Sequence, residues 1–309
     1  MLTFDKLKIV TKIDYIQIDD IDRFQQSIKN NTLTELKYNI TSPYLLYIEI
    51  DYLEKELVIE FSGKILGSDY KKLISTETIR QCFENINSIG VCTLDVEAIL
   101  EDAIVVKCDV TQDVYCADIS VVAEFIKGNV KSYKQFSVKC HRNGNLTIDK
   151  TVDTRQAKKR ITIYNKSREM KKMNNRKFMN EYNIPDAEFD NMCRFEINLN
   201  SKAQIRTSLG IADTRLMSVL TSTRNPIIDF LDDIVANTDE MIPLTDKQTY
   251  MTALVLRDCH DDLAVVEEKM RQIYAKGTNI SKVMKPYKEA LAQKSKSKFT
   301  KTDLLQMLR

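Results

Sequence analysis

Over the first 75 residues, hydrophobic and polar residues alternate in short runs with the period of two that a half-buried strand imposes. The runs are LKIV (7–10), ELKYNI (35–40), LLYIEI (45–50) and ELVIEFSGKIL (56–66). An acidic turn, DYLEK, separates the last two runs. This pattern predicts an antiparallel meander.

The pattern then changes between helical and strand spacing. Apolar residues at helical spacing predict a helix over 75–90, ending at Gly90. Further elements are expected in this order: a strand at 104–114, a helix at 120–128, a hairpin at 136–149 turning at Asn143-Gly144, a strand at 160–166, a basic helix at about 167–182 and a strand at 193–199. From about residue 203 only helices are expected, including a long one over 246–275. We therefore predict an α+β protein with an antiparallel-sheet domain over 1–210 and a helical C-terminal region over 211–309.

Three of these strands divide their side chains into one apolar and one polar face. The apolar positions are Val106, Cys108 and Val110, then Ile161 and Ile163, then Phe195, Ile197 and Leu199. The opposite positions are Lys107, Asp109, Thr111 and Asp113, then Arg160, Thr162, Tyr164 and Lys166, then Arg194, Glu196 and Asn198. If the strands are neighbours in one sheet, their polar faces merge into a single charged surface.

Converging carboxylates on such a surface are ligands that Mg²⁺ or Mn²⁺ prefers. Asp109 and Glu196 are the first candidates, with Glu169 to complete the set and Asp113 as a fourth option. Cations close to Tyr164 would favour its phenolate and make it a nucleophile toward phosphorus. The ordinary interpretation is a solvated strand face without a site, and it stays open at this point.

Charge is distributed unevenly along the chain. The net charge of +2 combines 12 basic and 21 acidic residues in 1–120 with 34 and 23 in 121–309. Residues 154–177 hold ten basic side chains and one acid, and residues 269–309 hold eleven and two. Two such runs favour a polyanionic partner over a merely solvated surface.

Other signals are absent from the sequence. There is no G-x-x-x-x-G-K-[ST], G-x-G-x-x-G or G-x-S-x-G motif, so ATP hydrolysis and dinucleotide chemistry have no support. The seven cysteines form no C-x-x-C pair, and no apolar run is long enough to cross a membrane. We expect a cytoplasmic protein with reduced thiols and no membrane partner.

The order VVKCDVTQDV (105–114), ITIYNKSRE (161–169) and CRFEINL (193–199) resembles the replication initiation proteins of phages and plasmids, including the filamentous-phage gene II type and the plasmid Rep family. The resemblance covers roughly residues 1–210. It implies a rolling-circle initiator: a DNA nickase that works in the cytoplasm of a bacterial host on single-stranded or supercoiled origin DNA. Further partners considered are a host helicase or polymerase and a second copy of the chain.

The resemblance also implies roles for individual residues. Asp109, Glu169 and Glu196 would hold Mg²⁺ or Mn²⁺, Lys166 and Arg194 would contact the scissile phosphate, and Tyr164 would be the nucleophile, with Tyr182 as the second candidate. The basic residues expected to bind DNA are Lys158, Lys159, Arg160, Arg168, Lys171 and Lys172. Two features depart from the family pattern: Lys107 replaces an arginine, and the chain has no His-hydrophobic-His pair.

Two other classes of function remain open. A non-catalytic DNA-binding replication protein on the same scaffold would need the basic residues but not Asp109, Glu196 or Tyr164. A structural or interaction protein would need neither.

Overall fold

A computed structural model describes residues 2–116, 118–131, 136–141, 145–150, 160–236, 247–260, 262–296 and 299–309. The chain divides into two compact units. The first comprises residues 1–119 and 137–230, and the second comprises residues 120–136 and 231–309. The predicted division after residue 210 stays a prediction.

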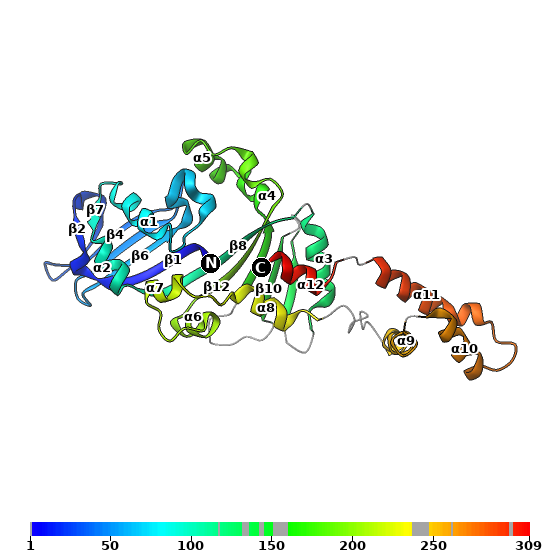
Figure 1. The fold of residues 1–309 in the computed structure, drawn as a ribbon. Coiled ribbons are helices and arrows are strands. Elements are labelled where there is room, and N and C mark those ends of the chain that lie inside the picture. The colour runs from blue at the N-terminus through cyan, green and yellow to red at the C-terminus, as the bar shows by residue number, and fades with distance from the viewer. Residues whose placement is uncertain are drawn as a thin grey trace. The chain divides into compact units, whose positions relative to one another are not determined.

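The first unit is built on a ten-stranded antiparallel sheet in the order β3-β4-β5-β6-β1-β8-β12-β11-β10-β9 (Figure 1). Its strands are β1 (Thr3–Lys12), β3 (Gln25–Lys29), β4 (Thr32–Ile40), β5 (Leu46–Asp51), β6 (Glu56–Ser62), β8 (Ile104–Tyr115), β9 (Phe136–Cys140), β10 (Leu146–Lys150), β11 (Arg160–Asn165) and β12 (Met192–Leu199). A separate pair joins β2 (Ile16–Ile18) and β7 (Cys92–Leu94). The predicted α+β class is confirmed, while the hairpin turn at 143–144 lies outside the described residues. The predicted meander holds for the neighbours β4, β5 and β6, but the run at 7–10 belongs to β1, which pairs with β6 and β8 instead of preceding β4.

The helices follow the prediction less closely. They are α1 (Ile79–Asn87), α2 (Val96–Asp102), α3 (Ile119–Asn129), α4 (Lys166–Met170), α5 (Met173–Glu181), α6 (Lys202–Leu209), α7 (Leu216–Leu220), α8 (Pro226–Ile234), α9 (Lys247–Asp258), α10 (Leu263–Ile273), α11 (Ile280–Lys296) and α12 (Lys301–Met307). The 3₁₀ segments are η1 (Ile13–Tyr15), η2 (Ile21–Arg23), η3 (Gly63–Lys72) and η5 (Asp186–Phe189). The end of the run predicted as a strand to residue 66 is therefore the 3₁₀ segment η3.

Two predicted helices are each broken in two. The one expected over 167–182 is interrupted between α4 and α5. The one expected over 246–275 ends at Asp258, because His260 takes a left-handed conformation with φ 51°. Asp262 then caps α10 by accepting from the backbone N–H of Ala264.

The three strands singled out in the sequence are neighbours. Strand β12 lies between β8 and β11, so Glu196 is opposite Thr111 on one side and Thr162 on the other. Arg194 is likewise flanked by Asp113 and Tyr164. The polar faces merge as predicted, and the buried apolar face includes Phe195 and Ile197.

Two irregularities in β1 and β8 change which residues face the core. The pairing shifts register between Lys8–Lys107 and Ile9–Val105, so Val105 is buried and Val106, expected on the apolar face, is only half-buried. A second shift between Phe4 and Lys6 lies at Asp5. An extra residue of this kind re-aims side chains, which accounts for Asp5 reaching the polar face.

The second unit contains a group of three helices with its own core. Helices α9, α10 and α11 bury Leu256, Cys259, Val266, Met270 and Met284 against one another. Elsewhere in this unit, Lys301 of α12 contacts Asp232 at 2.7 Å. Among the described residues, no helix has the length and hydrophobicity needed to cross a membrane.

Candidate functional site

Arg194 is the centre of a buried polar network on the merged face. Its side chain is 0% exposed, although a guanidinium is costly to bury without partners. Nε and Nη2 donate to the two carboxylate oxygens of Asp113, each at 2.7 Å. Nη1 donates to Asp5 at 2.5 Å and to the Tyr70 hydroxyl at 2.9 Å. This paired, two-pronged geometry holds β12 to both β8 and β1.

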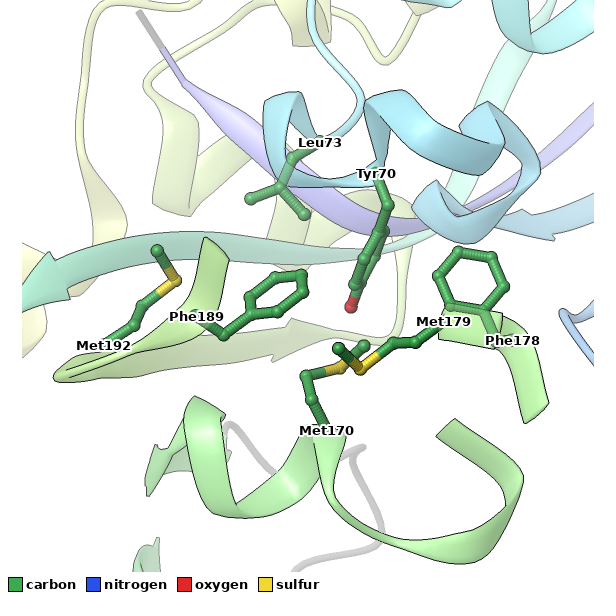
Figure 2. Packing of buried hydrophobic residues seen from close by; sticks show 7 residues of the cluster. All are labelled: Tyr70, Leu73, Met170, Phe178, Met179, Phe189 and Met192. Atoms are coloured by element: carbon green, nitrogen blue, oxygen red, sulfur yellow. The ribbon is translucent and has the colours of Figure 1, made fainter. Parts of the chain in front are cut away.

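The Tyr70 hydroxyl links this network to Lys166. Lys166 donates from Nζ to the Tyr70 oxygen at 2.6 Å, and Tyr70 donates to Asp5 at 2.9 Å. The Tyr70 ring lies between Phe178 and Phe189, with ring centroids at 5.5 and 6.0 Å (Figure 2). The polar network is therefore bounded by apolar rings on one side. Their low local dielectric strengthens the electrostatic interactions within the network.

Burial and neighbouring charges shift the pKa values of Lys166 and Asp5 in this network. Burial, reinforced by the charge of Arg194, lowers the pKa of Lys166 to about 7. Burial opposes ionisation of Asp5, but Arg194 and Lys166 more than offset it and lower the pKa of that carboxyl. Asp5 is thus an anion held between two buried basic groups.

Lys166 is not a strand residue as predicted. It begins α4, directly after Asn165, whose side chain caps the helix by accepting from the backbone N–H of Arg168 at 2.8 Å. The expectation that Lys166 and Arg194 contact the scissile phosphate does not fit their burial, since Lys166 is 3% exposed and Arg194 is fully covered. Both side chains lower the pKa of Asp5 through their positive charge.

Asp109 and Glu196 lie next to each other on the same face. Asn198 donates to Asp109 at 2.7 Å and to Glu196 at 3.4 Å, so one amide bridges the two carboxylates. Burial, together with repulsion from Asp5 and Asp109, raises the pKa of Glu196 to about 7. Burial also raises the pKa of Asp109. A cation between such groups would relieve their repulsion.

Tyr164 points its hydroxyl at this carboxylate pair. The hydroxyl donates to Glu196 Oε2 at 3.4 Å, and Lys166 Nζ lies 5.8 Å from the Tyr164 ring centroid. Burial raises the pKa of Tyr164 well above its ordinary value. In the free protein the phenol is therefore neutral and needs a base, rather than spontaneous ionisation, to become a nucleophile.

Glu169 is not brought to the carboxylate pair. It forms an ion pair with Lys172 and accepts from Asn175 at 3.3 Å. Among the described residues, no three His, Cys, Asp or Glu side chains form a group that could hold a metal ion. The donor set that fits a divalent cation here is the Asp109–Glu196 pair, with remaining positions left to water and phosphate.

The predicted DNA-binding residues are only partly visible. Arg168, Lys171 and Lys172 are exposed on α4 and just after it. Arg160 is exposed and pairs with Asp149 at 2.8 Å. Lys158 and Lys159 lie outside the described residues.

Sequence reasoning missed Asp5 and Tyr70. Asp5 precedes the run predicted at 7–10, and regular alternation would turn it to the side of the buried Leu7 and Ile9. Only the register shift in β1 directs it to Arg194. Tyr70 lies between the run predicted as a strand to residue 66 and the helix predicted from residue 75, where no element is expected. The KILGSDYKK sequence does show small and polar residues typical of a turn, which was the available signal.

No protein-family model matches this chain, and no curated protein matches it. Function is therefore inferred from the site and the sequence.

Proposed function

We propose that the protein is a rolling-circle replication initiator that nicks one strand of origin DNA through a 5′-phosphotyrosine intermediate. The observation that carries this proposal is the Tyr164 hydroxyl directed at Glu196, beside Asp109 and above a buried cationic network. A phenol, a base of pKa about 7 and neighbouring positive charge are what phosphoryl transfer to tyrosine requires. The resemblance described above supports the same reaction.

Cleavage transfers the phosphorus from the 3′ oxygen of the DNA to Tyr164. Tyr164 Oη attacks the phosphorus and passes its proton to the Glu196 carboxylate, which is its hydrogen-bond partner. The bond from phosphorus to the 3′ oxygen breaks, and that oxygen takes a proton from water and leaves as the 3′-hydroxyl. The hydroxide that remains takes up the proton held by Glu196, so the charges and protons balance. The phosphotyrosine conserves the phosphodiester bond energy, so cutting and rejoining need no ATP. A host polymerase would extend the free 3′ end.

Asp109 would hold Mg²⁺ or Mn²⁺ together with Glu196 Oε1, which leaves Glu196 Oε2 to accept the proton of Tyr164. When bound, a cation supplies Lewis-acid stabilisation of charge on the phosphate oxygens. Lys166 and Arg194 act as positioning residues: their charges keep Asp5 ionised and set the field around Tyr164. Glu169, which the resemblance assigns to the metal, would instead orient α5 through Asn175.

Basic surfaces would hold the DNA. The exposed side chains of Arg168, Lys171 and Lys172 lie close in sequence to Lys166, at the start of the site. On α11, Lys282, Lys285 and Lys288 are exposed on the side opposite its packed residues. Rows of lysine on a helix bind phosphate and release counterions.

The decisive experiment incubates the full chain with supercoiled and single-stranded DNA of its own replicon and Mg²⁺ or Mn²⁺, then separates products on denaturing gels. We expect a nick and a covalent protein–DNA adduct. Tyr164→Phe should abolish both, whereas the matched Tyr182→Phe should retain both. An adduct that survives in Tyr164→Phe and disappears in Tyr182→Phe would move the nucleophile to α5's C-terminal end.

A non-catalytic DNA-binding protein is the second candidate. The raised pKa of Tyr164 favours it, because a neutral, half-buried phenol is a poor nucleophile unless Glu196 acts as its base. In that case Glu196→Gln would leave DNA affinity unchanged and no cognate DNA would be cut by the wild type.

A further inference from the structure

A pocket of about 410 Å³ opens on the first unit between η3, α1 and the end of α5. Its walls include Tyr44, Gln81, Asn85 and Tyr182, and its apolar surface includes Leu66. Among the described residues that line it, none carries a charge. The volume falls within the range of small-molecule sites.

We propose that this pocket binds one base of single-stranded DNA; the inference rests on the proposed function and specifies its substrate. Phosphate and carboxylate ligands need cationic partners, which the lining lacks. A nucleobase is flat, neutral and apolar on its faces, with donors and acceptors around its edge. Two carboxamides, two phenols and an apolar wall match those properties.

Gln81 and Asn85 are one helical turn apart on α1, so their side chains project from the same face. Asn85 donates one amide hydrogen to the backbone oxygen of Ile65 at 2.9 Å, which fixes its orientation. A second amide hydrogen and the carbonyl oxygen remain for a ligand. Gln81 donates one amide hydrogen to Asp69 at 3.4 Å and likewise keeps a second hydrogen and its carbonyl oxygen. Asparagine and glutamine read the edge of adenine through such a donor and acceptor pair, so we expect a preference for adenine.

The position of the Tyr182 ring in the pocket depends on the glycine at position 67. Gly67 has φ +59°, and a Cβ at this position would lie 2.6 Å from Cδ1 of Tyr182. The absence of a side chain lets the Tyr182 ring rest on η3. Tyr44 and Tyr182 both line the pocket, and burial, together with the nearby Tyr182 phenol, raises the pKa of Tyr44 to about 12.

Packed rings connect this pocket to the catalytic residues. Tyr182 packs on Phe178 at 5.1 Å between centroids, and Phe178 packs on Tyr70 at 5.5 Å. Tyr70 accepts the hydrogen bond from Lys166. These contacts join the pocket wall to the buried network beside Tyr164, and in this proposal Tyr182 is a base-binding residue rather than a second nucleophile.

The test measures binding of fluorescent single-stranded oligonucleotides to the full chain by anisotropy. The probes are oligo(dA), oligo(dC), oligo(dT) and an abasic oligomer of equal length and charge. We expect wild type to bind oligo(dA) at least about fivefold more tightly than the abasic strand. Gln81→Ala and Asn85→Ala should each reduce this ratio without changing affinity for the abasic strand.

Gln26→Ala, which removes an exposed carboxamide from β3, is the matched control and should leave the ratio unchanged. Urea unfolding of every variant separates loss of binding from loss of fold. Equal affinity of wild type for base-bearing and abasic strands would overturn the proposal, as would an unchanged ratio in both pocket variants.

The adduct assay keeps the two proposals distinguishable. Base discrimination without any covalent adduct would uphold the pocket and remove the nickase. A covalent adduct without base discrimination would uphold the nickase and remove the pocket proposal.

Discussion

Arg194 and Asp113 face each other across neighbouring strands, and the guanidinium donates to both oxygens of the carboxylate at 2.7 Å. The Arg194 side chain is fully buried, and the Asp113 side chain is 13% exposed. Such a pair positions β12 against β8 and carries a large penalty if only one member is removed.

Asp113→Ala should therefore destabilise the first unit strongly. It leaves the Arg194 charge buried with fewer partners, and we expect a loss of about 3–5 kcal/mol in the free energy of unfolding, measured by urea denaturation. Asp102→Ala, which breaks an exposed pair with Lys12, is the control and should cost much less. Similar losses in both variants would contradict a special role for the buried pair.

Glu196 should make stability depend on pH between about 4.5 and 7. Its pKa in the folded chain is about 7, above the ordinary 4.5, so the folded state binds the proton more tightly. The contribution is complete below pH 4.5 and disappears as pH rises through 7. Relative to Glu196→Gln, wild type should lose up to about 3 kcal/mol across this window. Urea midpoints measured in EDTA test this, and parallel curves for the two proteins would refute it.

Lys166 should make the free energy of unfolding depend on pH above about 7, and here stability should rise with pH instead of falling. Its pKa falls from 10.5 to about 7 on folding, so the unfolded chain binds the proton more tightly between these values. Wild-type stability should rise with pH by up to about 1.4 kcal/mol per unit relative to Lys166→Met between pH 7 and 10. The comparison uses the difference in slope, because Lys166→Met also removes the hydrogen bond to Tyr70. No change in slope would mean that the amine is solvated.

Mn²⁺ binding distinguishes a two-carboxylate from a three-carboxylate site. Calorimetric titration near pH 6 should show proton release, because the pKa of Glu196 is raised to about 7 and this carboxyl must ionise to bind the cation. Asp109→Asn should weaken binding by at least about tenfold. Glu169→Gln should change Mn²⁺ affinity little, because Glu169 pairs with Lys172 rather than with the Asp109–Glu196 site. An equal loss in Glu169→Gln would restore the set of three carboxylates.

The exposed lysines of α11 should control the salt dependence of DNA binding. Removing Lys282, Lys285 and Lys288 together should reduce the slope of log affinity against log salt by up to about 2.7 on duplex DNA, since each phosphate contact contributes about 0.9. A matched triple variant at exposed Lys29, Lys55 and Lys127 removes the same charge elsewhere. If both triple variants change the slope alike, α11 has no specific contact with DNA.

The sequence predicted the elements that form the site better than the contacts within it. Period-two alternation placed Asp109, Glu196 and Tyr164 on polar faces, and the structure brings those faces together. It failed where backbone irregularity overrides periodicity: the register shifts in β1 and β8, the start of a helix at Lys166 and the turn at His260. These depend on one or two residues, which a pattern averaged over a strand or helix does not detect.

The amino-acid sequence by itself determined the α+β class, the strand faces and the uneven charge, because these follow from local periodicity and composition. Only the tertiary structure decided that Arg194 is buried beneath the site, that Asp5 and Tyr70 complete its network, and that Glu169 stands apart from Asp109 and Glu196. Burial and pairing across strands arise from contacts between residues far apart in the chain. The order of residues does not specify those contacts until the sheet is assembled.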